Sequence, residues 1–227
     1  EKLILTGRID RVDILDEEDK IFVKIIDYKS GSQSFNLADI FYGIQMQLIL
    51  YLDAFLESGQ ILYGKKIFPA GAFYFRIDDP IISSAGEMTE EELQKLLLKE
   101  LKLSGIVLED EEIIRKMDNT IEKSSDIIPV EMTKSGIGKK SNTATMEQFD
   151  SLREYVRKMA VEIGEEIIKG NVKISPYKSD KGSSCQYCLY KSICQFDTLL
   201  EDNHYKYLHK LSKDEIWKKI EESIEKE

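Results

Sequence analysis

The sequence has no surplus of basic residues. Its 227 residues include 32 Lys and Arg against 42 Asp and Glu, which gives a formal net charge of −10. Proteins that coat DNA by neutralising its phosphates are usually basic, so this balance argues against an autonomous DNA-coating role. It does not exclude an enzyme that acts on nucleic acid, because a magnesium site needs carboxylates and a partner subunit is able to supply a basic surface. The length suits one good core with appendages, or at most two small domains.

Long apolar runs and nucleotide-binding loops are missing as well. No stretch approaches the roughly 20 apolar residues that span a bilayer, and no signal peptide is visible. The phosphate-binding pattern GxxxxGK[ST] does not occur, because residues 136–141 lack its spacing. We therefore expect a cytoplasmic protein in which this chain does not itself hydrolyse ATP.

Cysteine is scarce and confined to one place. The three cysteines are Cys185, Cys188 and Cys194. An odd number so tightly grouped is a poor disulfide framework and indicates a reducing compartment. Thiolates at this spacing are able to hold zinc or an iron–sulfur cluster, but both normally take four ligands. The alternative is three reduced thiols that serve packing alone.

The first third of the chain predicts an α/β core. Residues 3–15 and 21–28 are apolar-rich runs separated by a charged stretch, which predicts an antiparallel hairpin. Residues 37–57 predict one long helix with Asn36 as its N-cap. Residues 70–77 predict a further strand. This order favours a mixed sheet covered by helices. The apolar stripe expected along the long helix consists of Leu37, Phe41, Ile44, Leu48, Leu52 and Phe55.

The rest of the chain is expected to be mainly helical. Helices are predicted over 89–103, 109–118 and 145–169, with a loop-rich connector over 124–143, a cysteine loop over 180–197 and a charged, helical tail. The expected division is a core over 1–87, a helical extension packed on it over 88–170, and the cysteine loop with the tail over 171–227.

Two acidic residues and a lysine form the candidate site. Asp10 lies on the first predicted strand, and Asp27 and Lys29 lie at the end of the second. A hairpin would bring the two carboxylates together, and the carbonyl of Tyr28 would add a third oxygen, a ligand set that suits Mg²⁺. Asp27 and Lys29 are two residues apart on a strand, so both side chains point to one face and Lys29 would orient the attacking water. The alternative is an exposed ion pair of little energetic value.

Gln47 and Tyr51 extend the candidate site. They lie four residues apart on the predicted helix, at the edge of its apolar stripe. There they would face the end of the sheet and contact DNA. The alternative is a core tyrosine and a polar residue at the helix edge.

The motifs resemble a known family. Three segments occur in the order found in the RecB-like branch of the PD-(D/E)xK nuclease superfamily: 7–11 (GRIDR), 26–31 (IDYKSG) and 42–53 (YGIQMQLILYLD). The segments 69–75 and 176–197 are similar to those of AddB-type subunits of bacterial helicase–nucleases. The resemblance implies a restriction-endonuclease-like fold, Mg²⁺ or Mn²⁺ held by Asp10 and Asp27, a catalytic Lys29, and supporting roles for Gln47 and Tyr51.

The resemblance also implies a cofactor and a partner. AddB-type proteins hold a [4Fe–4S] cluster with a cysteine trio that Cys185, Cys188 and Cys194 match, together with one cysteine far upstream. Because the sequence starts with Glu1, we expect a piece of a longer protein and place the fourth cysteine before it. The expected function is a metal-dependent exonuclease that acts with an AddA-like partner on the 5′-ended DNA strand during double-strand break repair. The alternatives are a non-catalytic DNA-end binding module and a stand-alone single-strand DNA exonuclease.

Overall fold

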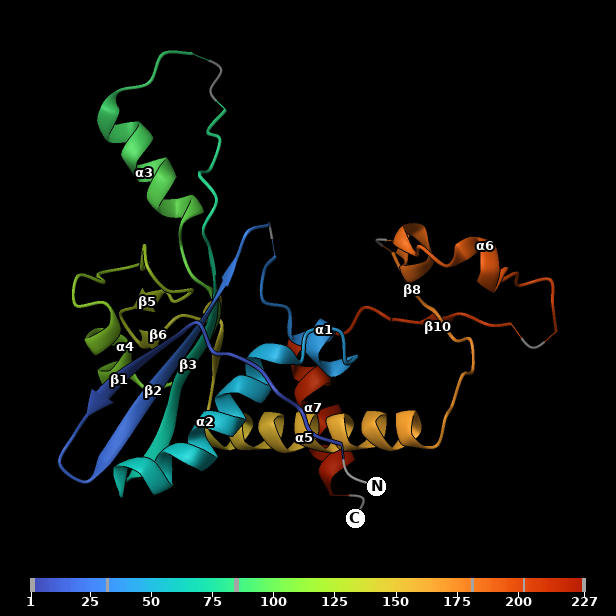
Figure 1. Cartoon of the computed structure of the whole chain (residues 1–227). Coiled ribbons are helices and arrows are strands. Elements are labelled where there is room, and N and C mark those ends of the chain that lie inside the picture. The colour runs from blue at the N-terminus through green and yellow to red at the C-terminus, as the bar shows by residue number, and fades with distance from the viewer. Residues whose placement is uncertain (1–2, 32, 84–85, 181, 202, 226–227) are drawn as a thin grey trace.

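A five-stranded mixed sheet forms the centre of the molecule. The computed structural model describes residues 3–31, 33–83, 86–180, 182–201 and 203–225. The strand order is β1-β2-β3-β4-β7, with β2 parallel to β3 and β4 parallel to β7 (Figure 1). Helices cover the sheet, so the predicted α/β fold with a mixed sheet is confirmed. The strands are β1 (Arg11–Asp16), β2 (Lys20–Lys29), β3 (Lys66–Arg76), β4 (Ser104–Leu108) and β7 (Thr143–Ala144).

The predicted hairpin is present, but its first strand is shorter than expected. β1 and β2 pair antiparallel, with Arg11 opposite Ile26 and Asp16 opposite Ile21. Residues 3–10 are not part of a strand, so Asp10 lies immediately before β1 rather than within it. Most residues of β2 are buried, as expected for a strand that has neighbours on both sides.

The prediction of a single long helix over 37–57 is wrong. The segment forms two helices, α1 (Leu37–Phe41) and α2 (Gln47–Tyr63). The predicted N-cap is confirmed, because the side chain of Asn36 accepts a hydrogen bond from the backbone N–H of Ala38. The break places Gln47 at the first position of α2.

Gly43 explains the break between the two helices. Its φ of 78° lies in the left-handed region, which ends a right-handed helix and favours glycine. A Cβ at Gly43 would lie 2.7 Å from the sulfur of Met159, so the turn also packs closely against another helix. Ile44 falls in the break and is 41% exposed, whereas Leu48 and Leu52 of the predicted stripe are fully buried.

Residues 88–170, predicted as a helical extension with a loop-rich connector, also contain strands. Two of their strands, β4 and β7, complete the central sheet. The missed strand β4 is a short apolar run, and its Gly105 allows the main chain to pack directly against Ala72 and Phe73 of β3. The other elements of this region are α3 (Glu90–Glu100), α4 (Glu111–Met117), β5 (Met132–Thr133), β6 (Gly136–Ile137) and α5 (Met146–Ile168).

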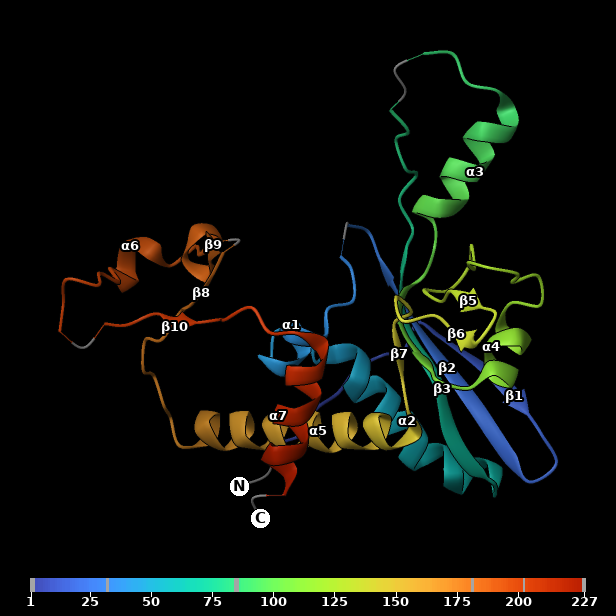
Figure 2. The ribbon, with the colours of Figure 1, turned by 180° about the vertical axis from the view of Figure 1, so that it is seen from behind.

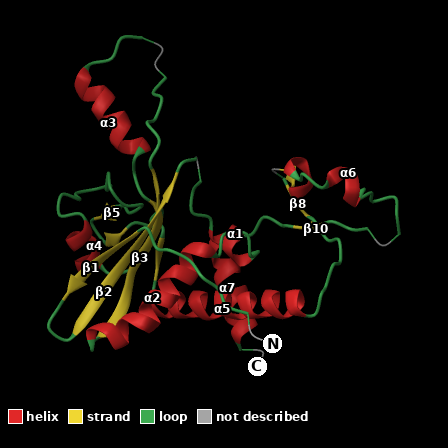
Figure 3. Cartoon of the chain, in the orientation of Figure 1, coloured by secondary structure: helices red, strands yellow, loops and turns green. Residues whose placement is uncertain are grey.

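Apolar side chains fill both faces of the sheet. Helices α2, α5 and α7 (Lys213–Ile224) lie over one face, and α4 with the β5–β6 hairpin lies over the other (Figure 3). A buried ion pair joins two of these helices: Asp53 of α2 accepts hydrogen bonds from Arg153 at 3.0 Å and from Arg157 at 2.7 Å, both on α5. In contrast, α3 stands away from the sheet and has no buried residue.

The cysteine-bearing segment lies between two helices that the core holds. It leaves the end of α5, extends to one side of the molecule, and returns to α7 (Figure 2). Among the described residues of the predicted helical tail, helix is confined to α7, whose Ile216, Trp217 and Ile220 are buried. Within the described ranges, no helix has the length and apolar character needed to cross a membrane. The segment contains β8 (Tyr177–Ser179), β9 (Gly182–Ser183), a 3-10 helix η1 (Ser184–Tyr187), α6 (Lys191–Cys194) and β10 (Lys206–Tyr207).

Candidate active site

Asp27 and Lys29 lie together at the end of β2. Asp27 is 3% exposed, and its Oδ2 lies 2.5 Å from Nζ of Lys29. Side chains two residues apart on a strand share a face, as the sequence predicts for this pair. The alternative to a catalytic pair was an exposed ion pair on the surface. The structure does not support that alternative, because the carboxylate of Asp27 is buried at the end of a strand inside the sheet.

Asp10 reaches the same end of β2 from the position just before β1. Its Oδ2 accepts a hydrogen bond of 2.9 Å from the backbone N–H of Tyr28. The antiparallel pairing of β1 with β2 ends with Arg11 opposite Ile26, so Asp10 follows at the point where Asp27 and Tyr28 lie. The hairpin therefore brings the two acidic residues to one end of the sheet.

A chain of hydrogen bonds connects Lys29 to α2. Nζ of Lys29 donates to Oε1 of Gln47 at 3.0 Å, and Nε2 of Gln47 donates to the hydroxyl oxygen of Tyr51 at 3.0 Å. The break before α2 makes this possible, because it places Gln47 at the start of a new helix facing the end of β2. The ammonium group of Lys29 is therefore held by an amide on one side and a carboxylate on the other.

Three residues at this site were not predicted from the sequence. Tyr74 lies opposite Asp27 on β3, and the ammonium group of Lys29 is 5.4 Å from the centre of its ring. Burial, together with the charge of Asp27, raises the pKa of Tyr74 to about 12. Arg76 lies opposite Lys29 in the same pair of strands.

The third of these residues, Gly7, supports Tyr51. A Cβ at Gly7 would lie 2.6 Å from the ring of Tyr51, so the glycine lets the chain pass close to the aromatic ring. The GRIDR motif pointed to this segment, but the contact joins positions 44 residues apart, and local patterns carry no information about it.

The donor set suits a hard divalent cation that keeps several waters. Asp27 offers a buried carboxylate whose Oδ2 is paired with Lys29, and Asp10 offers a second carboxylate at the same end of the sheet. Carboxylate oxygens are the ligands that Mg²⁺ takes in proteins. In the part of the chain that the structure describes, no three His, Cys, Asp or Glu side chains cluster as a metal site. Two carboxylates and water fit Mg²⁺ better than a site built entirely from protein ligands would.

The three cysteines lie apart from the carboxylates. Cys185, Cys188 and Cys194 have free thiols and line one cavity of about 160 Å³ with Phe196 and Tyr205. As positioned among the described residues, the thiols do not form a metal-binding cluster. The segment that carries them extends away from the sheet in both views of the chain (Figures 1 and 2).

We expect Gln47→Ala to reduce cleavage of DNA by roughly tenfold to a hundredfold in kcat, because Lys29 loses the amide oxygen that orients it. The measurement is steady-state cleavage of a labelled single strand by the full-length protein. Gln60→Ala is the matched control, since Gln60 is an exposed residue of the same helix. Equal kcat values for the two variants would show that the orientation of Lys29 does not limit the reaction.

Comparisons with known proteins agree with this geometry. A family model described as the PD-(D/E)XK nuclease superfamily matches residues 2–195, a range that contains every predicted site residue. Several similar relatives are named as the B subunits of an ATP-dependent helicase/deoxyribonuclease. The relative from Acetivibrio thermocellus is 52% identical over 218 residues, covering 96% of this chain and 19% of the relative. Relatives from Thermoanaerobacter sp. and Alkaliphilus metalliredigens are 46% and 49% identical over 228 residues, in each case 100% of this chain and 20% of the relative.

These matches confirm the resemblance to AddB-type subunits. The chain spans about a fifth of the length of the curated relatives that it matches. The family match covers both the sheet and the site at the end of β2. The chain therefore belongs to the PD-(D/E)XK nuclease superfamily.

Proposed function

We propose that this chain is the metal-dependent deoxyribonuclease domain of an ATP-dependent helicase–nuclease. The observation that carries the proposal is the buried carboxylate of Asp27, which pairs with the ammonium group of Lys29 at 2.5 Å at the end of β2 that Asp10 also reaches. The geometry supports hydrolysis of a phosphodiester, because that reaction needs a cation next to the scissile phosphate and a positioned water.

Asp10 and Asp27, with the carbonyl oxygen of Tyr28, are the ligands that we assign to the cation. Mg²⁺ or Mn²⁺ held there would supply positive charge for the phosphate oxygens and would lower the pKa of a bound water. Lys29 orients the attacking water and stabilises the charge that develops on the phosphate. Gln47 and Tyr51 hold Lys29 in place through their hydrogen-bond chain.

Arg76 adds a second cationic group at the same end of the sheet. It lies opposite Lys29 on β3, and its Nε forms an ion pair of 3.7 Å with Asp78 but no hydrogen bond among the described residues. A guanidinium group suits recognition of phosphate oxygens. We assign Arg76 to a phosphate of the bound strand.

The wider role follows from the relatives. Their name joins a helicase and a deoxyribonuclease in a single assembly. We propose DNA as the substrate, an AddA-like helicase–nuclease subunit as the partner, exonuclease action on the 5′-ended strand, a role in double-strand break repair, and a cytoplasmic location. Since no phosphate-binding loop of the GxxxxGK[ST] form occurs in the sequence, ATP hydrolysis is assigned to another part of the assembly.

We assign Cys185, Cys188 and Cys194 to a [4Fe–4S] cluster in the full-length protein. The three thiols line one cavity, and a four-thiolate cluster needs one cysteine from outside these 227 residues. The terminal helix α7 is packed into the core through Ile216 and Trp217. The cluster would therefore order the segment that carries it, rather than hold α7 in place.

The proposal is tested with the full-length protein and its partner subunit on DNA labelled at either the 5′ or the 3′ end. We expect cleavage with Mg²⁺ or Mn²⁺ and none with EDTA. Early release of short products from the 5′ label would support the assigned polarity. DNA-end binding without cleavage in the presence of either metal would favour the non-catalytic module. Cleavage by the isolated subunit without its partner would favour a stand-alone exonuclease.

A further inference from the structure

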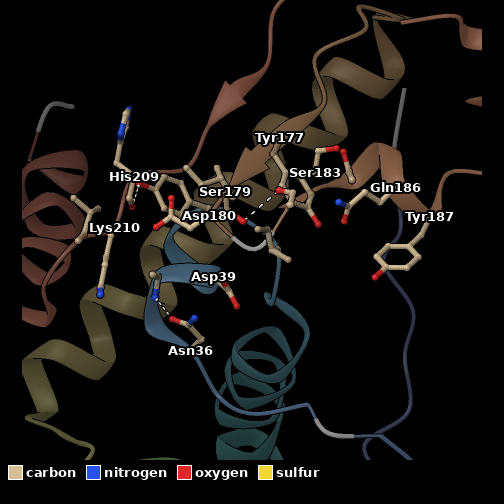
Figure 4. Close-up of a pocket in the computed structure, with 17 residues that line it drawn as sticks. Asn36, Asp39, Tyr177, Ser179, Asp180, Ser183, Gln186, Tyr187, His209 and Lys210 are labelled. Atoms are coloured by element: carbon tan, nitrogen blue, oxygen red, sulfur yellow. Dashed lines mark hydrogen bonds between the residues drawn. The ribbon is translucent and has the colours of Figure 1, made fainter.

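A large cavity lies between α1 and the cysteine-bearing segment (Figure 4). Its volume is about 720 Å³. One wall comes from residues 36–44, and the other comes from residues 177–180, 182–187 and 208–211. A hydrogen bond of 2.8 Å from the hydroxyl of Tyr42 to the carbonyl of His209 joins the two walls.

The chemistry of the lining fits nucleobases better than phosphates. Tyr177 and Tyr187 offer aromatic faces, and Asn36 and Gln186 offer amide donors and acceptors. Among the described residues of the lining, Lys210 is the single lysine or arginine, against the carboxylates of Asp39 and Asp180. Carboxylates repel phosphates, but they accept hydrogen bonds from the amino groups of bases. Aromatic faces bind bases by stacking, whatever the sequence.

The cavity also lies next to the proposed active site along the chain. The wall formed by α1 belongs to the segment between Lys29 and Gln47. These two residues are hydrogen-bonded to each other at the proposed active site. Ile44 lines the cavity three residues before Gln47, so their Cα atoms are at most about 11 Å apart. A strand cut at Lys29 therefore has the cavity within reach.

We propose that this cavity binds unpaired nucleotides of the strand being cut, with their bases inside it and their phosphates toward solvent. Bases in a duplex are paired and stacked, so they cannot present their faces to tyrosines. The cavity would therefore make the site select single-stranded DNA. This inference rests on the proposed nuclease function and adds to it the place where the strand is held.

Photo-crosslinking tests the proposal in the full-length protein. The probe is a short single-stranded oligodeoxynucleotide that contains 5-iododeoxyuridine, irradiated in EDTA so that no cleavage occurs, and the crosslinked peptides are identified by mass spectrometry. We expect crosslinks to Tyr177 or Tyr187, and fewer when the same oligonucleotide is paired with its complement. Crosslinks confined to other residues would overturn the proposal.

A kinetic comparison provides the second measurement. Tyr187 is 89% exposed, so Tyr187→Ala leaves the fold intact. We expect it to raise KM for a short single strand by roughly tenfold, with kcat unchanged, because one stacking contact is lost. Tyr190→Ala is the matched control, since Tyr190 is 69% exposed on the same segment and does not line the cavity. Equal KM values for the two variants would overturn the proposal, whereas the nuclease function itself depends on Asp27.

Discussion

Replacing Asp27 with Asn is expected to reduce metal-dependent cleavage by the full-length protein by at least about a thousandfold in kcat. Asn has the shape of Asp but lacks the negative charge that binds a divalent cation and pairs with Lys29. DNA binding should persist, because Lys29 and Arg76 keep their positive charges. The measurements are single-turnover cleavage with Mg²⁺ and, separately, binding of labelled DNA in EDTA.

Asp16→Asn is the matched control for this prediction. Asp16 lies on β1 in the same hairpin and pairs with Lys65 at 2.6 Å, at the end of β1 opposite Ile21 and away from Asp27. We expect this variant to cleave DNA at close to the parent rate, because it removes a carboxylate of the hairpin without changing the site. Unchanged cleavage by Asp27→Asn would show that Asp27 takes no part in the reaction, and it would contradict the proposed function.

Replacing Trp217 with Ala is expected to lower the free energy of unfolding by about 3 kcal/mol, the lower end of the range for large aromatic side chains. Trp217 is 5% exposed in the core between α7 and its neighbours. Its indole Nε1 is buried without a hydrogen-bond partner among the described residues. The substitution removes this unsatisfied donor as well, which offsets part of the packing energy that is lost. Urea denaturation of the chain, followed by circular dichroism, gives the value.

Lys218→Ala is the control on the same helix. The side chain of Lys218 is 76% exposed, so its truncation should change the free energy of unfolding by no more than about 0.5 kcal/mol. A change below about 1 kcal/mol for Trp217→Ala would mean that α7 is not packed as described. In that case the cysteine-bearing segment would be anchored to the core at one end only.

Local patterns predicted the parts of the site that depend on nearby residues. The alternation of a strand placed Asp27 and Lys29 on one face, and the hairpin brought Asp10 to Tyr28. The spacing of Gln47 and Tyr51 along a helix predicted that they lie on one side, and they are hydrogen-bonded to each other. In each case the geometry follows from the 2.0 or 3.6 residue period of a regular element.

The parts that were missed depend on contacts between distant segments. The break at Gly43 comes with close packing against Met159 of α5, 116 residues later in the sequence. The strand β4 is an apolar run of five residues, too short for periodicity to separate a strand from a helix. Tyr74 and Arg76 join the site through the parallel pairing of β2 with β3, which no local pattern specifies.

The position of β2 within the sheet affects how the site responds to thermal fluctuations. β3 pairs with β2 along its whole length as far as Lys29, whereas β1 pairs with it only as far as Ile26, so Asp27 and Lys29 are held in the sheet by β3. Strands inside a sheet open only in the largest, most cooperative fluctuations, whereas loops and termini open often. The spacing between the Asp27 carboxylate and the Lys29 ammonium group should therefore survive partial opening of the loops and of α3, and be lost when β2 separates from β3.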